Sequence, residues 1–251
     1  MRFFVFWLVM VGWVMSVAAQ QETVRLPRKE TVLPAWLAGE EKLEVYRFRA
    51  GETEMVVVDE GNLAKPKYGS LASALAANGC RTGSNGGYFA AGEAGVPIGL
   101  VRHEGMTVSR LATKGFSVAG VLYDDGKTLR LERSTRVSRS PESMREAVQG
   151  GPFLVEAGRA VAGLNAQKTA CRTFIATDGR GNWCLGISSP MTLKILAEHL
   201  SRPGTLRGFR VQTALNLDGG SSCALQCDGR RVQINLKPVR NYIGLRPRKK
   251  R

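Results

Sequence analysis

The chain has 251 residues, of which 43% are hydrophobic and 23% are charged, and its formal net charge is +15. This composition is that of a globular protein, and only two histidines are present, which excludes a histidine-rich zinc site. The basic residues are spread along the chain without a dense Lys/Arg helix, so we expect no nucleic-acid partner. A positive charge instead favours contact with anionic envelope polymers, phosphorylated glycans or lipid head groups.

Residues 1–19 are predicted to be a signal peptide. An uncharged apolar run from Phe3 to Val14 is followed by the small residues Val17-Ala18-Ala19, which fit the rule for a cleavage site. The alternative is an uncleaved anchor, because the apolar stretch is nearly long enough to span a bilayer. Both interpretations place the folded part outside the cytosol, in a secreted or periplasmic protein.

The first half of the mature chain is predicted to contain strands, a hairpin and two helices. After a lead-in at residues 20–41, strands are expected over 43–50 and 54–60, followed by a helix that Ser70 caps and Gly79 ends. Residues 116–134 predict a hairpin with its turn at Asp125-Gly126. A second helix is expected from Pro141, with Ser140 as its cap, to Gly150.

The second half continues the pattern of hairpins. Turns are predicted at Gly158 and Asp178-Gly179, a third helix at about residues 191–200 after Ser189-Pro190, and closing strands with a turn at Asp228-Gly229. We therefore predict an α+β fold with a mixed, mainly antiparallel sheet and about three helices. One domain spans residues 42–246, and residues 247–251 form a basic tail.

The five cysteines permit disulfides in an exported protein, although an odd number leaves at least one unpaired within the chain. Cys171 and Cys184 flank a predicted hairpin and are one candidate pair across it, while the sequence leaves the disulfide connectivity open. A serine hydrolase acting through Ser221 would need His103 or His199, and the sequence has no GxSxG motif.

Four clusters place small residues beside polar ones. They are Asn85-Gly86-Gly87-Tyr88-Phe89, Gln149-Gly150-Gly151-Pro152, Arg172-Thr173 and the run from Asn216 to Ser222. Glycine pairs let a ligand approach the backbone and leave N–H groups free to bind anions, although any one pair alone more often forms a turn. Several such clusters in one domain favour a binding or catalytic site.

The chain resembles the phosphodiester glycosidase family, and in particular its short exported bacterial members. The resemblance is carried, in order, by SNGGYF, VQGGPFLVEAGR, CRTFIATDG, ALNLDGGSS and KPVRNYIGL, and it covers residues 42–246. Membership implies hydrolysis of a sugar-1-phosphodiester to free sugar and a phosphomonoester. A phosphate leaving group is already stable as an anion, so a carboxylate near the anomeric carbon and donors to the phosphate oxygens are what the chemistry needs.

The resemblance assigns roles to the matching positions. Asp218 is the expected catalytic carboxylate, as base or nucleophile, Arg172 clamps the phosphate with its planar fork, and Asn85 positions the sugar. The expected anion cradle consists of Gly219, Gly220, Ser221 and Ser222. The remaining substrate-binding residues are expected to be Gly86, Gly87, Gly150, Gly151, Thr173, Asn216 and Asn241.

Two features depart from the family pattern. Lys237 stands where the family often has arginine, and lysine cannot make a bidentate contact, so phosphate handling there differs or shifts to Arg240. No second carboxylate is evident, and Glu93 and Asp178 are the nearest candidates. No cofactor and no metal are predicted. The alternative function is a non-catalytic envelope module that binds anionic or phosphorylated glycans.

Overall fold

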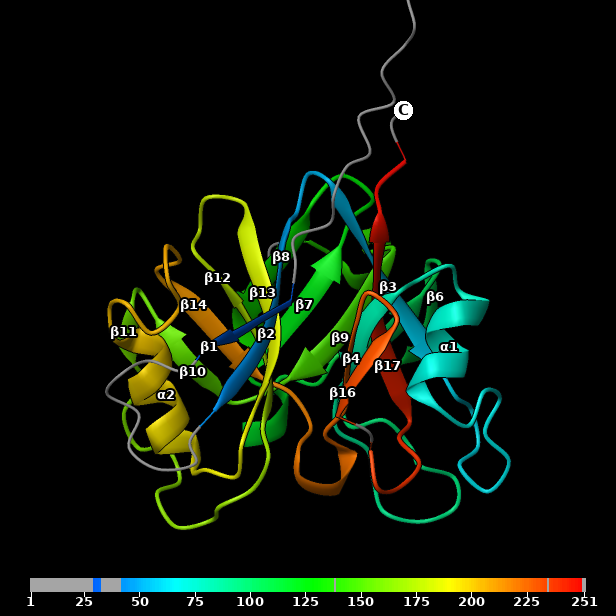
Figure 1. Cartoon of the computed structure of the whole chain (residues 1–251). Helices are drawn as coiled ribbons and strands as arrows, with labels where there is room; N and C mark the ends of the chain where they lie inside the picture. The colour runs from blue at the N-terminus through cyan, green and yellow to red at the C-terminus, as the bar shows by residue number, and fades with distance from the viewer. Residues whose placement is uncertain (1–28, 33–41, 138, 234, 250–251) are drawn as a thin grey trace, which may run out of the picture.

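The computed structural model describes residues 29–32, 42–137, 139–233 and 235–249 (Figure 1). The predicted signal peptide and most of the lead-in lie outside the described residues. No helix within these ranges is both long enough and apolar enough to cross a membrane.

Three sheets make up the molecule, and every strand pair among the described residues is antiparallel. The seven-stranded sheet contains, in spatial order, β1 (Lys29–Val32), β2 (Leu43–Arg49), β13 (Asn182–Ser188), β12 (Thr173–Thr177), β14 (Thr213–Asn216), β10 (Phe153–Glu156) and β11 (Arg159–Ala160). One five-stranded sheet contains β16 (Arg230–Gln233), β15 (Leu225–Cys227), β4 (Thr82–Asn85), β17 (Asn241–Pro247) and β3 (Thr53–Asp59). The other contains β6 (Met106–Ser109), β5 (Val101–His103), β9 (Glu146–Gly150), β7 (Gly120–Asp124) and β8 (Leu129–Arg133).

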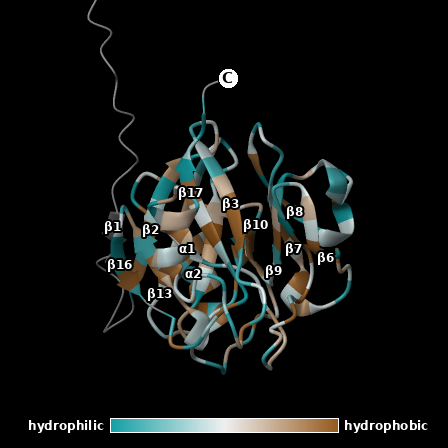
Figure 2. Cartoon of the chain, turned by 90° about the vertical axis from the view of Figure 1, so that its right-hand side faces the viewer, coloured by the Kyte–Doolittle hydropathy of each residue, from teal (hydrophilic) through white to brown (hydrophobic). Residues whose placement is uncertain are grey.

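The three sheets share one central core. Its buried side chains come from all of them, with Tyr46 and Leu185 from the first sheet, Ile243 from the second and Val148 and Leu122 from the third. The hydrophobic colouring in Figure 2 follows these strands. Burial of one continuous cluster across three sheets makes this a single domain of the predicted α+β, mainly antiparallel class.

Two α-helices cover the outer faces of two of the sheets. The predicted Ser70 cap is confirmed, because α1 (Leu71–Ala77) begins where the Ser70 side chain accepts a hydrogen bond from the Ser73 amide. Gly79, with φ +66°, follows the end of α1 as predicted. α2 (Leu193–Ser201) begins at Thr192, whose side chain accepts from the Ile195 amide, so the cap lies two residues later than Pro190. The helices stand on opposite sides of the molecule (Figure 1).

The predicted helix between Pro141 and Gly150 is wrong. Pro141–Ser143 forms only a 3-10 turn, and Glu146–Gly150 is strand β9, which pairs with β5 on one side and β7 on the other. The capping residues favour a helix start, but all five residues of β9 are buried between its neighbours. Tertiary pairing therefore overrides the local helix signals, and the domain has two α-helices instead of three.

The predicted hairpins are confirmed. Asp125-Gly126 lies in the turn between β7 and β8, where the Asp125 carboxylate accepts from the amides of Lys127 and Thr128. Hairpins also join β10 to β11, β12 to β13 and β15 to β16. The β15–β16 turn contains Asp228-Gly229, both with positive φ.

The strands run between two ends of the molecule that differ in content. The motif end comprises the loops at 86–98, 112–118, 150–152, 164–172, 217–223 and 235–240. The tail end comprises the turns at 50–52, 104–105 and 124–128 and the segment 246–248. Strand β17 joins the two, since Asn241 bonds Gly86 at one end and Arg248 contacts Asp124 beyond the other. In Figure 1 the tail end faces up, toward the C-terminus.

Candidate active site

Asp218 lies just past the end of strand β14, at the motif end. Its amide donates to the Gly86 carbonyl at 3.1 Å, and its Oδ1 accepts from the Gly219 amide at 2.8 Å. Burial raises the pKa of the Asp218 carboxyl, while the Ser222 hydroxyl and the Gly219 amide oppose that shift. A carboxylate whose pKa is raised by desolvation is one signature of a functional site.

A cavity of about 310 Å³ opens beside this carboxylate. The residues that line it are Tyr88, Phe116, Ser117, Asn165, Lys168, Ala170, Arg172, Leu193, Asp218, Gly219 and Gly220. Asp218 is the only carboxylate in that lining, and Lys168 and Arg172 are its cations. The cavity thus brings together the predicted acid and the predicted phosphate-binding arginine, which lie 46 positions apart in the sequence.

Arg172 is a buried cation without a carboxylate partner among the described residues. The side chain is 8% exposed, its Nε donates to the Met191 carbonyl at 3.2 Å, and its Nη2 donates to the Lys168 carbonyl at 2.5 Å. Burial lowers the pKa of the guanidinium. Two neutral carbonyls orient the fork without neutralising its charge, so Arg172 is suited to bind an anion in the cavity.

Asn85 bonds the backbone of Asp218 without lining the cavity. It is fully buried, its Nδ2 donates to the Asp218 carbonyl at 2.7 Å, and its Oδ1 accepts from the Thr173 hydroxyl at 2.7 Å and the Ala224 amide at 2.9 Å. Both polar atoms of the amide are therefore bound to protein groups. The arrangement makes Asn85 and Thr173 residues that position the Asp218 turn, and neither lines the cavity.

Gly86 and Gly87 allow the Asn241 side chain and the Gln149 backbone to approach closely. A Cβ at Gly86 would lie 2.1 Å from Asn241 Oδ1, and one at Gly87 would lie 2.4 Å from the Gln149 carbonyl. Asn241 Oδ1 accepts from the Gly87 amide at 2.8 Å. Only glycine fits these contacts, and the group that approaches is part of the protein.

Asn216 holds Tyr88 against the Gly151 carbonyl. Its Nδ2 lies 2.6 Å from the Tyr88 hydroxyl and 2.9 Å from the Gly151 carbonyl, which also accepts from Tyr88 at 3.0 Å. Burial raises the pKa of the Tyr88 phenol, and the charge of Asp218 adds to that effect. Tyr88 therefore stays protonated beside the acid.

Gly151 also brings the loop at residues 112–118 close to the site. A Cβ at Gly151 would lie 2.1 Å from the Phe116 carbonyl. Buried Gln149 bonds the same loop, because its Nε2 donates to the Ala112 and Val118 carbonyls at 2.7 and 3.0 Å. These contacts position the loop that carries Phe116 and Ser117, whereas Gln149, Gly150 and Gly151 do not themselves line the cavity.

The turn at Gly219–Ser222 differs from the expected anion cradle. The Gly219 amide donates to Asp218 itself, the Gly220 amide donates to the Cys171 carbonyl at 2.8 Å, and the Ser222 amide donates to the Gly219 carbonyl at 3.1 Å. These N–H groups are occupied within the protein. The turn thereby presents the carboxylate, and the positive groups that face the cavity are the side chains of Lys168 and Arg172.

A disulfide joins Cys171 to Cys223, so the candidate pairing of Cys171 with Cys184 is wrong. Cys184 faces Ala176 across the β12–β13 hairpin and is buried as a free thiol, because Cys171 lies just outside the strand pairing. The bond is adjacent to Arg172 and ends the Asp218 turn. It thus ties together the two segments that supply the acid and the arginine.

The remaining candidates lie elsewhere or have other partners. Asp178 accepts from Arg180 and Asn182 within its own hairpin turn, and exposed Glu93 does not line the cavity. Arg240 pairs with Asp59 at 2.7 Å, which leaves it bound to a carboxylate. Exposed Lys237, His103, His199 and exposed Ser221 are likewise absent from the cavity lining.

The sequence analysis assigned a role to four of the eleven lining residues, and those without one include Tyr88, Lys168 and Phe116. Tyr88 follows the Gly86-Gly87 pair directly, so an aromatic residue after two glycines was an available signal. Lys168 and Phe116 lie in loops without a distinctive motif, and only the fold brings them to Asp218. Within the described ranges, no group of three or more His, Cys, Asp or Glu side chains is arranged to hold a metal ion.

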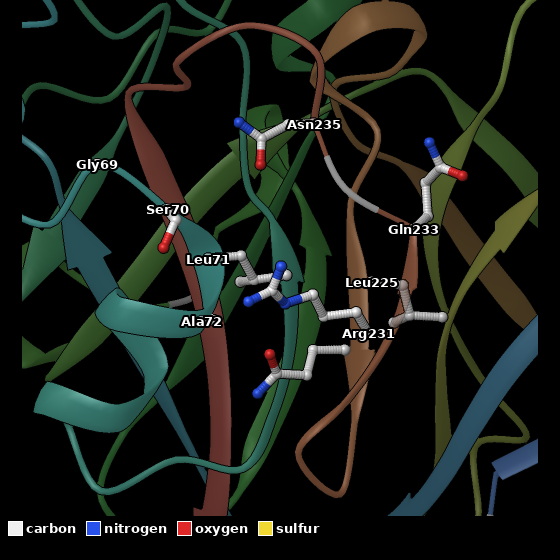
Figure 3. A pocket seen from close by; sticks show the side chains of 9 residues that line it. Gly69, Ser70, Leu71, Ala72, Leu225, Arg231, Gln233 and Asn235 are labelled. Atoms are coloured by element: carbon white, nitrogen blue, oxygen red, sulfur yellow. The ribbon is translucent and has the colours of Figure 1, made fainter.

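A second cavity, of about 200 Å³, lies beside the start of α1 (Figure 3). Arg231 extends into it from β16, with Asn235 and Ser70 at its edge. Its lining contains no carboxylate. This cavity therefore lacks the acid that glycosyl transfer to water requires.

Comparisons with known proteins show the family of the chain. A family model described as phosphodiester glycosidase matches residues 78–246. No curated protein sequence matches the chain.

Solved structures share the fold. A hypothetical protein from Synechocystis is 16% identical with a TM-score of 0.57, and the match covers 86% of this chain and 61% of that one. This chain thus spans less than two thirds of the Synechocystis protein. The catalytic domain of zebrafish N-acetylglucosamine-1-phosphodiester alpha-N-acetylglucosaminidase, auto-inhibited by its pro-peptide, is 12% identical with a TM-score of 0.60, and the match covers 89% and 88%. A Burkholderia pseudomallei protein is 12% identical with a TM-score of 0.57, over 82% and 74%. At such identities the likeness shows the fold alone.

Proposed function

This chain belongs to the phosphodiester glycosidase family, and from that premise we propose that it hydrolyses a sugar-1-phosphodiester to free sugar and a phosphomonoester in the cavity beside Asp218. The observation that carries the proposal is that a partly buried carboxylate, Asp218, and a buried arginine, Arg172, line the same cavity without forming an ion pair with each other. In this proposal Asp218 acts at the sugar and on the attacking water, and Arg172 binds the phosphate.

Asp218 is the proposed catalytic carboxylate. The reaction breaks the bond between the anomeric carbon and a phosphate oxygen, and positive charge develops on the sugar in the transition state. A carboxylate at that carbon stabilises this charge and assists the attack of water or bonds to the carbon itself. Asn85 holds the Asp218 carbonyl, and Gly219 holds Oδ1, so the acid is oriented before substrate binds.

Arg172 and Lys168 are the proposed phosphate ligands. The leaving phosphate gains negative charge as the bond breaks, and preoriented cations in a partly desolvated cavity stabilise that charge. Arg172 is oriented by the Met191 and Lys168 carbonyls, while exposed Lys168 supplies a second positive charge from the same loop. No proton donor to the leaving group is required, since a phosphodiester leaves as a stable anion.

The test follows sugar release from a panel of sugar-1-phosphodiesters. We expect wild-type turnover, and a loss of about 10³-fold or more in kcat for Asp218→Asn, because the neutral amide cannot stabilise the cationic transition state. Asp178→Asn is the matched control, because that acid caps a turn at the tail end of β12. Equal turnover by wild type and Asp218→Asn would refute the assignment.

The same panel separates catalysis from simple binding. A non-catalytic glycan-binding module would bind the phosphodiesters without releasing sugar, and Asp218→Asn would bind them as wild type does. We propose that the reaction takes place outside the cytosol, on the basis of the predicted signal peptide at residues 1–19. N-terminal sequencing of exported protein tests this, with a new terminus near Gln20 expected.

A further inference from the structure

Most of the large exposed apolar side chains lie on loops of the motif end, where the cavity opens. The large hydrophobic residues exposed within the described ranges are Val96, Ile98, Met106, Val108, Phe116 and Leu236. Four of these six, Val96, Ile98, Phe116 and Leu236, lie on loops of the motif end, and we name these four the apolar rim. They come from three loops that are far apart in the sequence.

Each of those loops is bonded to the cavity or lines it. The Ile98 amide donates to the carbonyl of Tyr88, a lining residue, at 2.8 Å. The Leu236 amide donates at 2.8 Å to the carbonyl of Ser221, which adjoins the lining residue Gly220. Phe116 lines the cavity itself and is 55% exposed. An apolar rim around a polar site is typical of a surface that meets another apolar body.

Positive charge accompanies the rim. Exposed Lys114 and Lys237 lie within two positions of Phe116 and Leu236, and exposed Lys168 lines the cavity. Glu93 is the exposed acid on the same loop as Val96. The formal net charge of the chain is +15. Cations interspersed with exposed Phe, Ile and Leu side chains favour the surface of an anionic bilayer, where lysines meet head groups and apolar side chains enter the acyl boundary.

We propose that the apolar rim is a docking surface for an anionic lipid bilayer, and that the substrate is a sugar-1-phosphodiester whose aglycone is a lipid. The substrate assignment rests on the proposed function, whereas the docking surface does not. A phosphodiester held by Arg172 and Lys168 would leave its aglycone at the cavity mouth. The side chains that meet the aglycone there are those of the apolar rim.

The first test measures sedimentation with vesicles of phosphatidylcholine, with and without phosphatidylglycerol. The protein starts at Gln20, because the apolar run at residues 3–14 would itself bind lipid and every described strand begins at or after Lys29. We expect wild type to bind the anionic vesicles and to lose binding as salt rises. The variant Ile98→Ser/Leu236→Ser should bind about tenfold or more weakly, since two apolar side chains no longer enter the bilayer.

Met106→Ser is the matched control. Met106 is 66% exposed, comparable to Leu236 at 77%, but it adjoins Gly105, whose amide bonds Arg145 at the tail end. This variant should bind vesicles as wild type does. Equal binding of wild type and the rim variant, or no binding by wild type, would overturn the docking surface. A third outcome is that wild type dimerises without binding vesicles and that the rim variant stays monomeric. The apolar rim would then be an interface with a second copy of the chain, and the proposed docking surface would be overturned.

The second test compares a lipid-linked phosphodiester in vesicles with a water-soluble one that carries the same sugar. In the rim variant the ratio of lipid-linked to soluble turnover should fall about tenfold, because only the lipid-linked substrate depends on docking. An unchanged ratio would overturn the substrate class. Wild type that binds vesicles but releases no sugar from either compound would refute the proposed function and leave the docking surface intact.

Discussion

The buried carboxylates at the tail end are paired with arginines, whereas Asp218 and Arg172 at the motif end have no oppositely charged partner among the described residues. At the tail end, Asp124 is 1% exposed and accepts from Arg248 at 2.6 Å and from the Met55 amide at 3.2 Å. Glu54 pairs there with Arg246 and Arg145. At the motif end, Asp218 and Arg172 are bound by backbone groups and make no ion pair with a described residue.

The difference separates charges that hold the fold from charges that await a ligand. Desolvating a charge costs free energy, and a paired, hydrogen-bonded partner offsets that cost. Tail-end charges have such partners, so their role is structural. Asp218 and Arg172 have no such partner, which folding alone does not explain, and a bound phosphosugar would supply the missing interactions. The comparison leads to four predictions.

The largest effect is expected from neutralising one acid at each end. Asp124→Asn should lower the free energy of unfolding by about 3–5 kcal/mol, because it leaves a buried arginine without its partner. Asp218→Asn should leave stability at neutral pH unchanged or higher. The raised folded pKa of Asp218 means that the folded state loses stability as pH rises through that pKa, and an amide avoids this loss.

Chemical denaturation at neutral pH measures both variants. If Asp218→Asn proved as destabilising as Asp124→Asn, the distinction between the two ends would fail.

The next effect concerns the disulfide, which links the segment that carries Arg172 to the turn that follows Asp218. Its ends lie 52 positions apart, and the chain-entropy account gives about 4 kcal/mol for closing such a loop. Cys171→Ala/Cys223→Ala should therefore lower the unfolding free energy by about 3–4 kcal/mol. Sugar release should fall as well, because Arg172 and the Asp218 turn are no longer tied together. Denaturation with and without reductant gives the measurement.

Cys184→Ala serves as the control for loss of a buried sulfur, and only a smaller change is expected from it. Wild type whose unfolding is insensitive to reductant would argue against the bracing role.

A smaller effect is expected from Arg172→Lys. Lysine keeps the charge but has no planar fork, so kcat/KM for a sugar-1-phosphodiester should fall about tenfold to a hundredfold. Inhibition by inorganic phosphate should weaken in parallel. Arg240→Lys provides the comparison at the same end, because Arg240 pairs with Asp59 and does not line the cavity. Equal losses in the two variants would remove the reason to assign Arg172 to the phosphate.

The smallest effect is a displacement of the acid limb of the pH profile. Catalysis needs the Asp218 carboxylate, so kcat/KM should fall as pH decreases through its pKa, which burial raises above the ordinary aspartate value of 3.8. The inflection should therefore lie above 3.8. Asp178→Asn should leave this limb in place. If the inflection of kcat/KM lay at or below 3.8, the titrating acid would not be Asp218, whose pKa burial raises.

Local signals predicted much of the fold. Ser70 caps α1 as its side chain and position indicated, and Asp125-Gly126 forms the turn that its residue types favour. These features depend on neighbours in the sequence, whose chemistry is legible from the residues alone. The helix predicted at 141–150 is wrong because the structure of this segment depends on residues that are distant in the sequence. Strand β9 is stabilised by β5 and β7, whose paired residues lie at least 22 positions away in the chain.

The candidate site divides in the same way. The sequence by itself determined that a buried strand ends at Asp218 and that Arg172, Asn85 and the glycine pairs were candidates, because these residue types carry recognisable chemistry. Only the tertiary structure decided which atoms remain available. It bound the Asn85 amide and the Gly219 and Gly220 N–H groups within the protein, joined Cys171 to Cys223, and left Asp218 and Arg172 facing one cavity. The physical reason is that hydrogen-bond partners and burial are properties of spatial neighbours, and those neighbours are set by strand pairing across the whole chain.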